Sequence, residues 1–109
     1  MNTSKLFALI LLGCVSGPLL AADMSPMQHE YMTSMGHMQG SMQGSMMETN
    51  PDIAFAKGML AHHQGAVEMA RIQLKYGKDP EMRTLAENVI KSQGPEIQQM
   101  QAWLAAHPK

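Results

Sequence analysis

The sequence predicts an all-α fold, an antiparallel helical hairpin over residues 50–109 that follows a methionine-rich segment. Two helix start signals support this: Asn-Pro-Asp at 50–52 and Asp-Pro-Glu at 79–81 each place a capping side chain before a proline and an acid. Apolar residues recur at three- and four-residue steps after both signals. Because only a short connection separates the two stripes, the second helix should fold back antiparallel on the first.

Residues 1–22 are predicted to be a secretory signal peptide. Lys5 gives a positive start, Leu6 to Leu12 an apolar stretch too short to span a bilayer comfortably, and Leu20-Ala21-Ala22 a small-residue cleavage site. Leu11 to Cys14 also fit a lipoprotein signal, in which an acylated Cys14 would anchor the chain to a membrane. We favour cleavage after Ala22, which predicts a periplasmic or secreted protein.

Cleavage after Ala22 removes Cys14, the single cysteine of the chain, and with it any disulfide, Fe–S cluster or thiolate site. The net charge of −1 offers nothing to recruit nucleic acid or an anionic membrane. A domain this small usually relies on a disulfide, a metal or a partner chain. A metal ion or oligomerisation is therefore expected.

Residues 23–49 are predicted to be a flexible metal-binding segment rich in Met and His. Eight of the 13 methionines lie between Met24 and Met47, where there is no Leu, Ile, Val or Phe, so without metal the segment should be disordered. The near-helical spacing of Met27, Tyr31 and Met35 leaves a helical stretch over Pro26 to Met35 as an alternative. Thioethers select Cu(I), with Ag(I) as its mimic. A solvated linker with incidental histidines is the alternative. The predicted ligands are Met27, His29, Met32, Met35, His37, Met38, Met42, Met46 and Met47.

The first hairpin helix should run from the Asn50 cap to Tyr76, with Gly77 ending it. Its apolar stripe includes Phe55, and Gly58 and Gly65 share a side that we interpret as a close backbone approach. The second helix carries a stripe from Met82 to Leu104, in which Pro95 predicts a kink or a short break rather than an end.

The first helix also carries the sharpest candidate for chemistry, Met59, His62, His63 and Met69. Met59 lies one turn before both histidines and Met69 two turns after His62, so the four should project along one side. Sulfur favours Cu(I) and imidazole accommodates Cu(II). The alternative is that these residues are core. Met100, on the inner stripe of the second helix, is a further candidate ligand with the same alternative.

Met-x-x-His-His at 59–63, followed by Gln93, Glu96-Ile97 and Trp103-Leu104, resembles the domain of unknown function 305 family, which includes CopM-like exported copper-binding proteins. The resemblance covers Asp52 to Leu104. It implies a ferritin-like bundle of antiparallel helices, copper held by Met and His, and a role in copper tolerance or trafficking. Fuller members carry the His-His unit twice, which favours two hairpins of this chain pairing as a homodimer into a four-helix bundle.

The sequence thus predicts an exported copper-binding protein that sequesters or traffics Cu(I), with a copper exporter or another exported copper carrier as partner. The alternative is a helical interaction module whose methionines form an adaptable packing surface. An enzyme is not expected. Di-iron catalysis in such bundles needs Glu-x-x-His, and no histidine here has an acid three residues before it.

Overall fold

The computed structural model describes residues 23–108, which form three helices joined by short turns. α1 spans Pro26–Ser45, α2 Pro51–Tyr76 and α3 Pro80–Ala106. Each begins with a proline after a capping side chain, from Ser25, Asn50 and Asp79 respectively. No strand occurs between residues 23 and 108, so the all-α prediction is confirmed. The predicted signal peptide and Cys14 lie outside the described residues.

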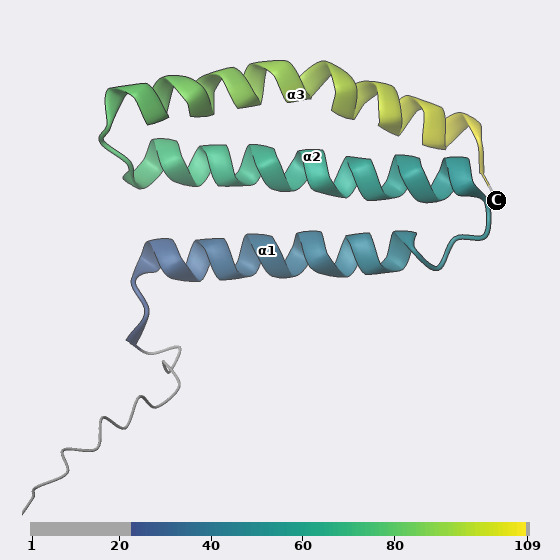
Figure 1. Cartoon of the computed structure of the whole chain (residues 1–109), viewed down its shortest axis with the longest axis horizontal. Coiled ribbons are helices and arrows are strands. Elements are labelled where there is room, and N and C mark those ends of the chain that lie inside the picture. The colour runs from purple at the N-terminus through teal and green to yellow at the C-terminus, as the bar shows by residue number, and fades with distance from the viewer. Residues whose placement is uncertain (1–22, 109) are drawn as a thin grey trace, which may run out of the picture.

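α2 is the central helix, with α1 packed on one side and α3 on the other (Figure 1). The predicted antiparallel hairpin is the α2–α3 pair, and its bounds agree with the start signals and with Gly77 as the end of α2. The pairing of two such hairpins into a four-helix bundle stays a prediction. None of the described helices is long and apolar enough to cross a bilayer.

The prediction that the methionine-rich segment is flexible is wrong for Pro26–Ser45, which forms α1. Its start is stabilised by a capping box, in which the Ser25 hydroxyl accepts from the Gln28 backbone and the Gln28 side chain accepts from the Ser25 backbone. Its packing relies on small residues, with Ser34 and Ser45 buried against α2. A helix of this kind needs no leucine to pack closely.

The glycines of α2 mark where α1 approaches most closely, as their spacing predicted. A Cβ atom at Gly65 would lie 2.5 Å from the Met38 sulfur, and one at Gly58 would lie 3.1 Å from the Ser45 hydroxyl. Any side chain at Gly65 would therefore have to move Met38. Because Gly58 and Gly65 have no side chain, the backbones of α1 and α2 can come close together there.

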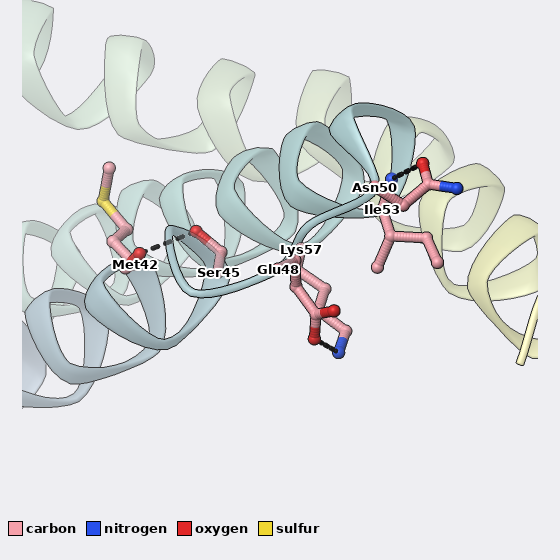
Figure 2. A network of polar contacts seen from close by, with 6 residues as sticks. All are labelled: Met42, Ser45, Glu48, Asn50, Ile53 and Lys57. Carbon is pink, nitrogen blue, oxygen red and sulfur yellow. Dashed lines mark hydrogen bonds and ion pairs between the residues drawn. The ribbon is translucent and has the colours of Figure 1, made fainter. Parts of the chain in front are cut away.

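Local polar contacts fix the turn between α1 and α2, and one ion pair joins the two helices at their far ends. At the turn, Ser45 donates to the Met42 carbonyl within α1 at 2.6 Å, Asn50 caps α2 by accepting from the Ile53 amide at 3.3 Å, and Lys57 of α2 pairs with Glu48 of the turn at 2.5 Å (Figure 2). At the other end Lys75 of α2 pairs with Glu30 of α1. The hydrogen bond to Glu30, and then that to Tyr76, raises the pKa of Lys75 above its ordinary value. This pair is therefore retained until strongly alkaline pH.

The hydrophobic core is sparse, and both faces of the three-helix layer are open. No large side chain in residues 23–108 is fully buried, and Phe55 and Leu85, both on predicted apolar stripes, are 67% and 54% exposed. α1 and α3 cover two roughly opposite sides of α2. Of the two faces left uncovered, one carries Phe55 and Met69 and is called the open side below, and the other carries the exposed Gln64 and Arg71. α3 continues through Pro95 without a break and is gently bowed (Figure 1). The buried apolar residues are Ile53, Ala56, Ala61, Val67, Ala70, Ile72 and Ala86.

Replacing Gly65 with Leu should loosen α1 from α2, because the new side chain meets Met38 at a position with no free space. Overpacking of this kind costs about 1–3 kcal/mol, so the thermal unfolding midpoint should fall. Gly36→Leu is the matched control, since a Cβ at Gly36 meets nothing within 4 Å. Circular dichroism melts of the two variants measure the difference. Equal midpoints would contradict close packing at Gly65.

Candidate metal centre

A depression of about 260 Å³ between α2 and α3 brings two thioethers beside one imidazole. Met59 and His63 are one turn apart on α2, and Glu96 and Met100 are one turn apart on α3. The antiparallel register that sets Glu96 against His63 also sets Met100 against Met59. The lining residues are Phe55, Met59, His63, Glu96, Gln99 and Met100.

His63 is the most constrained side chain of this depression. It is only 8% exposed, and its Nε2–H donates to the Glu96 carboxylate at 2.5 Å. In the neutral imidazole the other ring nitrogen, Nδ1, then carries a lone pair, and it is buried with no hydrogen-bond partner among the described residues. A buried polar atom left unpaired costs about 1–3 kcal/mol. Carboxylates commonly orient metal-binding histidines through the second nitrogen, so Nδ1 of His63 is available as a ligand.

His62 and Met69 do not join Met59 and His63 in this depression. Both are exposed, Met69 by 44%, and the His62 and His63 ring centroids lie 6.1 Å apart. Met69 lines a second depression, farther along α2 and beside Leu85 of α3. Consecutive residues on a helix point about 100° apart, which separates the two histidines. The four predicted ligands are therefore divided. Met59 and His63 line the depression, whereas His62 and Met69 lie on the open side of α2.

The candidate ligands of α1 are spread along the helix rather than gathered at one point. His29 and His37 line a shallow depression beside Glu68, but they are two turns apart, about 12 Å along the axis, too far to share one ion. In residues 23–108 no three His, Cys, Asp or Glu side chains come together where they could hold a metal. Met38 and Met42 are half-buried residues, and Met27, Met32, Met35, Met46 and Met47 are 37%, 64%, 52%, 74% and 82% exposed.

Sequence reasoning gave Glu96 no role at the site, although it lies within the family pattern. The signal that could have found it is the four-residue step from Glu96 to Met100, which repeats the step from Met59 to His63 on the facing helix. In two antiparallel helices joined by a short turn, moving back along one helix matches moving forward along the other. Because His63 faces Glu96, Met59, one turn earlier, faces Met100, one turn later. The ligand roles of all these residues remain predictions.

Comparison with known proteins agrees with the resemblance seen in the motifs. No curated protein sequence matches the chain significantly. Residues 15–104 match a family described as a domain of unknown function, DUF305. The match extends over α1, α2 and nearly all of α3, and it includes every residue of the depression between α2 and α3. The chain therefore belongs to the DUF305 family.

Proposed function

We propose that this chain is an exported copper-binding protein that sequesters Cu(I) or passes it on, with Ag(I) as a mimic, in copper homeostasis or tolerance. The supporting observation is the depression lined by Met59, Met100 and His63, together with the Nδ1 atom of His63, which is buried without a hydrogen-bond partner among the described residues. Two thioethers and one imidazole form a soft ligand set that suits Cu(I). Copper is cargo in this proposal, and the role is binding rather than catalysis.

Each side chain of the depression has a part in holding the ion. Met59 and Met100 supply sulfur, His63 supplies nitrogen, and Glu96 fixes the orientation of the imidazole through its 2.5 Å hydrogen bond. The Glu96 side chain is 61% exposed, so the depression is reached from solvent past a carboxylate. A carboxylate at the entrance attracts a cation, which helps loading.

The exposed methionines of α1 have a complementary role. They capture copper ions at any of several surface positions rather than at one defined site. Met32, Met46 and Met47 are between 64% and 82% exposed, so an ion can bind without displacing packed residues. Such weak surface binding suits exchange with a copper exporter or another exported copper carrier. In this proposal α1 exchanges ions, while the α2–α3 depression retains them.

Metal preference should run strongly toward Cu(I) and Ag(I) over Zn(II), because thioethers are soft and zinc prefers Cys, His or carboxylate ligands. The measurement is anaerobic competition with a chromogenic Cu(I) chelator, repeated with Zn(II) and a zinc indicator at neutral pH. Equal affinity for zinc would contradict the soft-ligand proposal.

A helical interaction module is the second candidate, and the open side of the layer favours it. Phe55 and Leu85 are more than half exposed there, which is unusual for large apolar side chains without a partner. In a pure packing module the methionines should bind Cu(I) no more tightly than free methionine does. The anaerobic titration separates the two functions.

A further inference from the structure

α2 carries a line of residues on the open side of the layer that α1 and α3 flank but do not bury. Its members alternate at three- and four-residue steps, the spacing of a coiled-coil seam. None of them is buried, and Phe55 and Met69 are 67% and 44% exposed. The open seam, as we call it, consists of Asp52, Phe55, Met59, His62, Ala66, Met69, Gln73 and Tyr76.

We infer that a second copy of this chain docks antiparallel on the open seam, and that the partner's Met69 joins Met59 and His62 to hold a soft metal ion between the copies. The inference rests on the proposed function for the metal, but the docking stands on packing alone. The interface differs from the expected four-helix bundle, because α1 already occupies one side of α2.

The seam can pair with itself when two copies of α2 lie antiparallel, with the two-fold axis passing midway between His62 and Ala66. This register decides which residues face each other. His62 faces the small side chain of the partner's Ala66, and Met59 faces the partner's Met69. At the ends of the seam, Phe55 faces the partner's Gln73, and the Asp52 carboxylate faces the hydroxyl of the partner's Tyr76. Antiparallel helices also place their dipoles favourably.

The open side is large enough for a stable dimer. α2 has 26 residues, which gives a face about 39 Å long and, across three helices, about 20 Å wide, or roughly 800 Å². Stable interfaces bury about 800 Å² per partner. The depression beside Met69, about 310 Å³, is lined by no charged side chain. A single layer of helices without a fully buried side chain gains a core by pairing.

Pairing changes the metal chemistry of His62, which has an exposed imidazole, with its ring centroid 6.1 Å from that of His63. The antiparallel register adds the thioether of the partner's Met69 to Met59 and His62, giving two sulfurs and one nitrogen at each of two equivalent positions. By helical phase Met59 lies between His62 and His63, so it is common to this position and to the α2–α3 depression. Because Met59 can bind Cu(I) at either position, the ion can pass from the seam position to the depression without leaving its sulfur ligand.

The docking of two copies is tested by analytical sedimentation. The sample is the protein purified after expression of the full chain. Without metal, at micromolar concentration, it should be a dimer. Ala66→Glu, which places a charge at the centre of the seam, should be monomeric with unchanged helical content. Gln64→Glu is the matched control, because it adds the same charge to an exposed position of α2 outside the seam, and it should remain dimeric. A monomeric wild type, or a dimeric and folded Ala66→Glu variant, would overturn the docking.

Mixed dimers test whether the partner supplies a ligand. His62→Ala and Met69→Leu should each lower the Cu(I) affinity of the seam position by at least about tenfold while the dimer persists. Co-expression of the two variants should restore part of the binding, because a mixed dimer keeps one complete set of ligands. Absence of restoration would overturn the role of the partner's Met69. A wild-type dimer that binds no Cu(I) would refute the proposed function and the metal position, but not the docking.

Discussion

Replacing His63 with Ala should remove the retained Cu(I) ion, lowering the affinity of the α2–α3 depression by at least about tenfold. The reason is the loss of the one nitrogen ligand that Glu96 holds in place, at a position where Nδ1 has no other partner. Helical content should be nearly unchanged, because Ala is the better helix former. The measurement is anaerobic titration against a Cu(I) chelator, with circular dichroism on the same samples.

His107→Ala is the matched control, since it removes an exposed imidazole at the end of α3, stacked on Trp103 rather than lining the depression. Met100→Leu gives an independent check, because it removes a sulfur while keeping the side-chain volume. Wild-type affinity in His63→Ala would contradict the assignment. A collapse of the helical signal would show instead that His63 is a core residue.

Deleting residues 23–48 should lower both the copper capacity and the unfolding midpoint of the metal-free protein. Composition alone predicts no effect on the midpoint, but α1 covers Ala61, Gly65 and Ile72 of α2. Burial of a side chain such as Ile72 contributes about 1.5–3 kcal/mol, most of which would be lost with α1. The measurement is a set of thermal melts, with and without Cu(I), on the full-length and truncated proteins.

Equal midpoints for the two metal-free proteins would show that α1 does not pack on α2 in solution, and a flexible segment would then be the better description. Equal Cu(I) capacity would show that the thioethers of α1 take no part in binding. The unfolding midpoint tests the packing of α1 on α2, and the Cu(I) capacity tests ion binding by α1, so either prediction can be contradicted without the other.

The hairpin could be predicted because its signals are local. Asn50 and Asp79 cap their helices, Gly77 ends α2, and the short connection requires an antiparallel return. α1 was missed because its packing does not depend on large apolar residues. Ser45 fits against α2 at Gly58 and Met38 at Gly65, a fit that appears only when both helices are in place.

The candidate site was predicted in part. Met59 and His63 were expected as ligands, and the structure places both in one depression with Met100, which was the other open candidate. The separation of His62 from His63 could not be predicted, because their spacing does not say which side of α2 is covered. That depends on α1 and α3 occupying two sides of α2 and leaving the side that carries His62 open.

X-ray absorption spectroscopy of the protein loaded with one equivalent of Cu(I) tests the central claim most directly. The sample is the Ala66→Glu variant, in which the seam between copies cannot form and only the depression remains to bind copper. We expect both sulfur and imidazole nitrogen around copper. The nitrogen signal should be lost in His63→Ala and a sulfur contribution in Met100→Leu. A copper environment of nitrogen and oxygen alone, or a spectrum that neither substitution changes, would contradict a thioether and imidazole site between α2 and α3.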